Sequence, residues 1–256
     1  MKNIFHIASL ELKRMRRNQM AWFVVLISAF LLFLMNQFNY FSIEEQFKMI
    51  KDFSLGIMNI VGLLLVVYFP VSLIQDDIKE KTIFSILSTP VSKTSLLLGK
   101  ALAFAILLLL TICINTISLI IILKMKGAPI EIDIFYAVLM IYLKNLTLTG
   151  YAFIFAVLPL SSFISIFLTF FVFCLGTVKT YFESMLANYV NIDFPFIIQK
   201  ITFVLIPNLK IFDVVEKITL GKNFDIKLLY FSFLHFIGIS MLTYFLATIM
   251  FEKQEL

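Results

Sequence analysis

The chain has 256 residues, of which 61% are hydrophobic and 14% are charged, and its mean hydropathy is +1.00. Soluble domains carry about 25% charged residues, so these values exclude a soluble globular protein and indicate an all-α integral membrane protein. The net charge of +5 fits contact with anionic membrane lipid and gives no reason to expect nucleic acid as a partner.

The N-terminal segment, residues 1–19, is predicted to form an amphipathic helix that lies on the membrane. Apolar residues recur at helical spacing along it, and basic residues surround them. Glu11 falls within the apolar sector, where it either pairs with a nearby arginine or reaches out to the headgroups. The charged residues assigned to this segment are Glu11, Arg14, Arg16 and Arg17.

Six apolar runs are long enough to be membrane-spanning helices. The run 134–178 has 45 residues and one charge. As one helix with a rise of ~1.5 Å per residue it would far exceed a bilayer, so we expect a hairpin that turns at Pro159. Pro70 is expected to kink the second span near its end. The predicted spans are 20–38, 53–74, 96–123, 134–158, 160–178 and 228–251.

The polar stretch 75–95, between the second and third spans, is predicted to form a short helix. Asp76 or Asp77 is expected to cap its N-terminus, where an acidic side chain also suits the helix dipole. Pro90 ends it, and another helix is expected to start near Ser92. A short rigid helix here is suited to contact something outside the bilayer; an ordinary interfacial loop is the alternative.

Residues 179–227 are polar but rich in aromatic and aliphatic side chains. Their apolar pieces are too short to cross the membrane, so short helices at the outer interface are expected before the last span.

Few residues along the chain suggest chemistry. His6 and His235 are too far apart in sequence for a zinc motif, and His235 is expected to be a packed interior residue. Cys113 and Cys174 lie in apolar runs and are expected to be buried thiols. No metal site is predicted.

Lys144 is the exception, because it falls near the middle of the fourth predicted span. An ionisable group at that depth is a functional candidate by default. With Asn145 it is assigned to a substrate pathway, where it would contact an anionic group. The alternatives are a lysine that snorkels to the interface or pairs with backbone carbonyls, or a span boundary that lies elsewhere. Undiminished transport by a Lys144→Met variant would reject the functional reading.

Three groups of residues resemble a known family. The order Glu80, Thr82, Leu87, Pro90, Ser92-Lys93 and Gly99-Lys100 is similar to the first cytoplasmic loop of ABC-2 type permeases, the membrane subunits of ATP-driven exporters. Residues 11–18 resemble the elbow helix with which these permeases begin, and the charged tail 252–256 is typical of them. Lys81 stands where the family usually has glycine.

The resemblance implies that the stretch 75–95 is a coupling helix that docks on a separate ATPase subunit. A second copy of the chain, or a related permease, would complete the pathway. The residues assigned to coupling are Glu80, Thr82, Phe84, Leu87, Pro90 and Lys93.

The chain itself is expected to be neither an enzyme nor a nucleotide-binding protein. A phosphate-binding loop ending at Lys100 would need glycine at position 94 and Ser or Thr at position 101, where the chain has Thr94 and Ala101. ATP and Mg²⁺ are therefore expected on the partner ATPase.

With the N-terminus placed inside, the inner and the outer segments each hold ten Lys and Arg residues, so the totals do not set the orientation. The segments on either side of the first span decide it. Five basic residues precede the first span and two follow it, which places both termini in the cytoplasm. A prokaryotic-type cytoplasmic membrane is the expected location.

Two other functions stay open. A secondary transporter would need internal repeats and ionisable residues at mid-membrane; the sequence shows no repeat, and Lys144 is the only such residue in the predicted spans. A membrane anchor or assembly factor would use the same coupling surface without transport. The cargo is not identified by any motif.

Overall fold

The computed structural model describes residues 2–17, 22, 26–28, 30, 34, 43–80, 92–187, 206–214 and 226–254. These residues contain helices and no strand. In chain order the elements are α1 (Lys2–Arg17), α3 (Ile43–Lys79), α5 (Lys93–Met125), α6 (Asp133–Val157), α7 (Ser162–Ala187), the short 3-10 helix η2 (Leu209–Phe212) and α10 (Ile226–Lys253).

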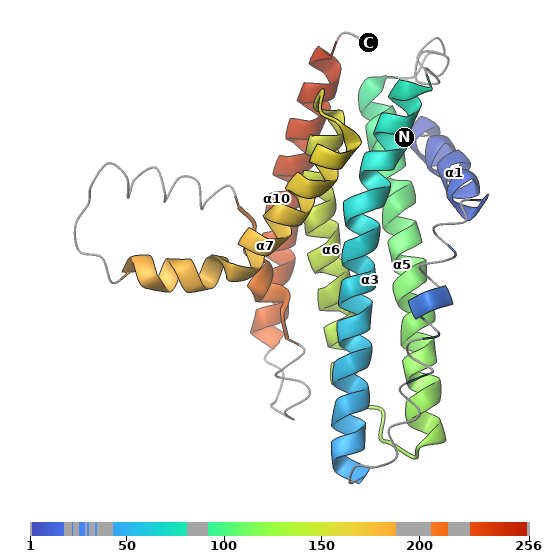
Figure 1. The fold of residues 1–256 in the computed structure, drawn as a ribbon, viewed down its shortest axis with the longest axis vertical. Helices are drawn as coiled ribbons and strands as arrows, with labels where there is room; N and C mark the ends of the chain where they lie inside the picture. Colours follow the sequence, from blue (N-terminus) through green and yellow to red (C-terminus); the bar gives the residue numbers. More distant parts are fainter. Residues whose placement is uncertain are drawn as a thin grey trace.

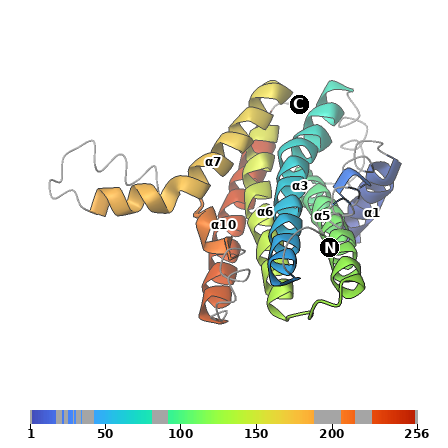
Figure 2. The same cartoon turned by 60° about the horizontal axis from the view of Figure 1, so that its bottom comes forward.

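Within the described residues, five helices are long and apolar enough to cross a membrane: α3, α5, α6, α7 and α10. Figure 1 shows α3, α5, α6 and α10 running alongside one another. Helix α6 is central and packs most extensively against α3 and α10. Figure 2 shows α1 beside α5, at the edge of the bundle opposite α7.

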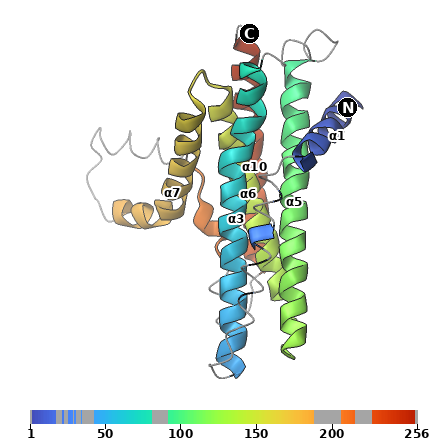
Figure 3. The ribbon, with the colours of Figure 1, turned by 45° about the vertical axis from the view of Figure 1, so that its right-hand side comes forward.

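One end of the bundle is shared by the termini of several of the described helices. Helices α3, α6 and α10 end there, α5 and α7 begin there, and α1 lies close by (Figures 1 and 3). We call it the α1 end. The C-terminal part of α7 projects sideways from the other helices in both views.

Local sequence rules account for three helix boundaries. Ser92 is the N-cap of α5, and its hydroxyl accepts a hydrogen bond from the backbone N–H of Ser95 at 3.2 Å, so the predicted start near Ser92 is confirmed. Leu158, before Pro159, adopts an extended conformation and ends α6, which confirms the hairpin. Gly127, with φ of +72°, ends α5 in a Schellman motif.

Helix α3 differs from the prediction. It runs without interruption from Ile43 to Lys79, with Pro70 inside it, so the prediction that Asp76 or Asp77 caps a new helix is wrong. Both aspartates lie in its last turns, and the backbone N–H of Glu80 still donates to the carbonyl of Asp76 at 2.9 Å.

Five predicted spans coincide with described helices, although α7 continues to Ala187, well past the predicted end at residue 178. The predicted first span, 20–38, lies outside the described residues except for residues 22, 26–28, 30 and 34.

Candidate functional site

Helix α1 lies against the first turns of α5, and Gly99 determines how closely the two helices approach. Ile7 and Ala8 of α1 are buried. A Cβ atom at position 99 would lie 2.7 Å from Cγ2 of Ile7 and 3.2 Å from the carbonyl oxygen of Ile4. These distances are shorter than ordinary van der Waals contact, so the observed approach requires glycine.

The next residue, Lys100, is fully buried beneath α1 and is surrounded by oxygen atoms. Its ammonium donates to Oε1 of Glu11 at 2.6 Å, to the carbonyl oxygen of Leu73 at 2.9 Å, and to Oδ2 of Asp77. A lysine has three N–H donors, and each has an acceptor here. Lys100 thereby joins α1, the last turns of α3 and the first turns of α5.

Arg14 of α1, whose side chain is partly exposed, is the fourth charged residue of this group. Its Nη1 donates to Oδ1 of Asp77 at 2.5 Å and lies 3.9 Å from Oε2 of Glu11. Burial lowers the pKa of Arg14, but the hydrogen bond to Asp77 and the negative charges of Asp77 and Glu11 outweigh it, so the net direction is upward. We call Glu11, Arg14, Asp77 and Lys100 the charge cluster.

The charge cluster is electrically neutral, with two carboxylates and two cations. Charged groups are buried at low cost only when they are paired and hydrogen-bonded, and separating them in a low-dielectric interior is expensive. The arrangement therefore acts as a lock between three helices.

Further polar contacts tie the remaining helices together at the α1 end. Nζ of Lys93 donates to the carbonyl oxygen of Gln254 at 2.7 Å, which holds the start of α5 to the end of α10. Nε2 of Gln75 donates to the hydroxyl of Ser165 at 2.9 Å, and Nζ of Lys79 donates to that of Ser162 at 2.5 Å. These two contacts hold the end of α3 to the start of α7.

Comparison with protein families decides the kind of molecule. A family described as "ABC-2 family transporter protein" matches residues 7–182, which is more than half of the chain and contains the whole charge cluster. The chain belongs to the ABC-2 transporter family. It is a multi-pass membrane protein and a permease of an ABC-type transporter. A search of curated proteins finds no match.

The structure places the predicted coupling residues of the permease only in part. Glu80 is exposed just past the end of α3, and Lys93 is the first residue of α5. The others lie outside the described residues: Thr82, Phe84, Leu87 and Pro90.

The predicted residues of the N-terminal helix divide between the cluster and the surface. Glu11 and Arg14 belong to the charge cluster, Arg17 is exposed, and the side chain of Arg16 is not described. Glu11 pairs chiefly with a lysine of α5, and an arginine is its more distant partner. Sequence reasoning missed Asp77 and Lys100 as its partners, although an acidic residue within an apolar helix face is a signal for a buried cation.

Lys144 and Asn145 of α6 contact different neighbours. The ammonium of Lys144, a residue only 5% exposed, lies 5.5 Å from the ring centre of Phe173 on α7. Asn145 is buried against α3, where a Cβ atom on Gly62 would be 2.5 Å from its Nδ2. Asn145 therefore lies in the contact between α6 and α3, and its assignment to a substrate pathway stays a prediction.

Two other expectations can be compared with the structure. Nε2 of His235 accepts a hydrogen bond from the backbone N–H of Asn208 at 3.2 Å, and its ring packs beside Phe212, as expected of an interior residue. Cys174 is partly buried, but Cys113 is exposed on α5, so the prediction that it is a buried thiol is wrong. The described residues contain no group of three or more His, Cys, Asp or Glu that could hold a metal ion.

Proposed function

We propose that the chain is the permease subunit of an ABC exporter, with the segment between α3 and α5 docking on a separate ATPase subunit. The ATPase carries ATP and Mg²⁺, and a second copy or a related permease completes the pathway. The predicted span 20–38 makes six spans in all. The family match supports the transporter class, and the charge cluster supports the coupling role.

The charge cluster is the observation that carries this proposal. Asp77 lies at the end of α3 and Lys100 near the start of α5, on either side of the proposed docking segment, and Glu11 brings α1 to both of them. A displacement of the docking segment would therefore move α3, α5 and α1 together. If these helices were joined flexibly, the same displacement would not be transmitted to all three.

The α1 end is proposed to face the cytoplasm, in a prokaryotic-type cytoplasmic membrane. Lys13, Arg14 and Arg17 are exposed on α1, and cytoplasmic segments near spans carry an excess of such residues. The C-terminal end of α10 lies at the same end, so the C-terminus is cytoplasmic too.

The docking proposal is tested by co-purification of an ABC ATPase with the affinity-tagged permease. The variant Phe84→Asp with Leu87→Asp should lose the ATPase, because two charges replace apolar contacts on the docking segment. Ile130→Asp with Ile132→Asp is the matched control, since both isoleucines are exposed at the opposite end of the bundle. Equal recovery of ATPase with both variants would reject the proposal.

Lys144 is proposed to contact an anionic group of the substrate. A buried ammonium beside an aromatic ring within a spanning helix needs a counter-charge. Among the described residues, Asp213 acts on Lys144 only by longer-range attraction and forms no ion pair with it, so an anionic group of the substrate is proposed to take that place. Loss of transport in the Lys144→Met variant, with normal membrane insertion, is the expected result. The substrate itself is proposed only as an amphipathic peptide, lipid or lipid-linked molecule.

A further inference from the structure

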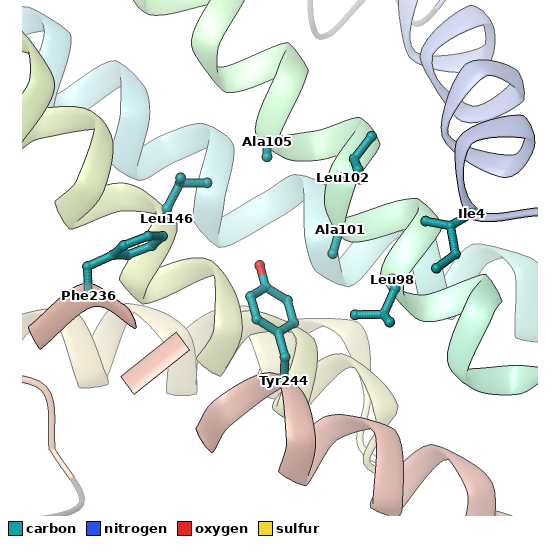
Figure 4. Close-up of a pocket in the computed structure, with 8 residues that line it drawn as sticks. All are labelled: Ile4, Leu98, Ala101, Leu102, Ala105, Leu146, Phe236 and Tyr244. Atoms are coloured by element: carbon teal, nitrogen blue, oxygen red, sulfur yellow. The ribbon is translucent and has the colours of Figure 1, made fainter. Parts of the chain in front are cut away.

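An apolar groove lies between α5 and α10, with α6 as its floor and α1 at one end. Its volume is about 420 Å³, within the range of roughly 300–1,000 Å³ that small-molecule sites occupy. Figure 4 shows the side chains around it, with the hydroxyl of Tyr244 directed into the space. The lining residues are Ile4, Leu98, Ala101, Leu102, Ala105, Leu146, Phe236 and Tyr244.

Small side chains on α5 create the groove. Ala101 and Ala105 are one helical turn apart, so they face the same side of α5. Tyr142 of α6 donates from its hydroxyl to the carbonyl oxygen of Ala105 at 3.2 Å, which fixes α5 against α6 at this level. Leucine at the two alanine positions would fill the space without altering the rim.

The surroundings of the groove determine what can occupy it. Helices α5, α6 and α10 are all long and apolar enough to span a membrane. The two helices that flank the groove also carry exposed apolar side chains, including Leu109 on α5 and Met241 and Phe245 on α10, which are 43%, 71% and 65% exposed. An open apolar groove between two such helices is expected to face lipid, and an apolar cavity of this kind does not hold water well.

We propose that the groove is a binding site for one acyl chain of a bilayer phospholipid, which enters sideways between α5 and α10. Ile4 of α1 and Leu98 of α5 line the groove near the α1 end, while Leu146 and Phe236 line it further along the bundle. The headgroup would then stay at the level of α1 while the chain lies along α5. Occupancy would support α1 where it lies on α5, and these are two of the three helices that the charge cluster joins.

The proposal is tested with the full-length permease in nanodiscs of phosphatidylcholine and phosphatidylglycerol, without ATPase or ATP. A small fraction of the phosphatidylcholine carries a photoreactive diazirine in the middle of one acyl chain, and adducts are mapped by mass spectrometry. Adducts at Leu146 are the informative result, because this part of α6 is reached from the bilayer through the groove. Adducts at Met241 and Phe245 report ordinary lipid contact and correct insertion.

The variant Ala101→Leu with Ala105→Leu should lose the adducts at Leu146 and keep those at Met241 and Phe245. The single variant Ala105→Val provides a smaller filling step if the double variant inserts poorly, and should reduce the Leu146 adducts. Ile117→Phe is the matched control, because it enlarges a lipid-facing side chain of α5 outside the groove and should leave them unchanged.

Two results would overturn the proposal. Wild-type protein labelled at Met241 and Phe245 but not at Leu146 would mean that another part of the chain, or a second copy, covers the groove. Leu146 adducts that persist in both alanine variants would mean that lipid reaches α6 by another route. Neither result bears on docking of the ATPase, because the experiment contains no ATPase.

Discussion

Lys100 is a fully buried cation whose three donors meet two carboxylates and a carbonyl oxygen. Replacing Lys100 by methionine keeps an unbranched side chain of similar size but leaves Glu11 and Asp77 buried with Arg14 as their one remaining partner in the cluster. Because an uncompensated buried charge costs about 3–5 kcal/mol, we expect a marked loss of thermal stability and of ATP hydrolysis by the complex with the ATPase. Thermal unfolding of the purified permease measures the first effect, and ATP hydrolysis by the complex measures the second.

Two comparisons isolate the charge effect. Lys51→Met removes a lysine whose partner Glu131 is 45% exposed, so the carboxylate keeps water and the loss should be about 1 kcal/mol or less. Adding Glu11→Gln to Lys100→Met should recover most of the stability, because it removes the excess negative charge while Asp77 keeps its pair with Arg14. A double variant as unstable as Lys100→Met would show that the cluster does not act through charge.

At this scale the sequence predicted single residues better than it predicted their partners. Glu11 is marked by its place within an apolar helix face, and Lys100 by its place in the family-like L-G-K segment. Asp76 or Asp77 was predicted to be a helix cap, a role that depends only on neighbours along the chain. The actual role of Asp77 depends on Lys100 and Arg14, which approach it only when three helices pack.

At the scale of single helices, the close packing of α1 on α5 depends on the missing side chain of Gly99. Alanine there would place Cβ 2.7 Å from Ile7 and force α1 outward, at a cost of about 1–3 kcal/mol for overpacking. Gly56→Ala in α3 is the matched control, since nothing lies within 4 Å of its added Cβ and the change should stabilise the helix by about 0.5–1 kcal/mol. Thermal unfolding of both variants measures these effects. A Gly99→Ala variant as stable as the wild type would mean that α1 accommodates the extra methyl group by a shift that costs little.

Helix boundaries were predicted correctly where they depend on a few consecutive residues. Ser92 as a cap, the turn at Pro159 and the lengths of the apolar runs each depend on a few consecutive residues, and the structure has them. The end of α3 was missed because contacts distant in sequence stabilise it: Gln75 and Lys79 are held by the start of α7. The groove between α5 and α10 was missed for the same reason, since two alanines in an apolar run predict no cavity.

At the scale of the whole permease, the charge cluster predicts that α1 and the adjoining turns of α3 and α5 move as one body during the ATP cycle. Separating paired charges in a buried site is costly, so motion should occur elsewhere in the bundle. Spin labels at Leu10 on α1 and Ile106 on α5, both exposed positions, report this directly when Cys113 and Cys174 are replaced by serine. Their distance distribution, measured by pulsed electron paramagnetic resonance, should be the same in the nucleotide-free and ATP-trapped complexes, provided that the labelled complex still hydrolyses ATP. A distance that shifts or broadens on ATP binding would mean that α1 moves against α5, and the cluster would then be a contact that breaks in each cycle instead of a lock.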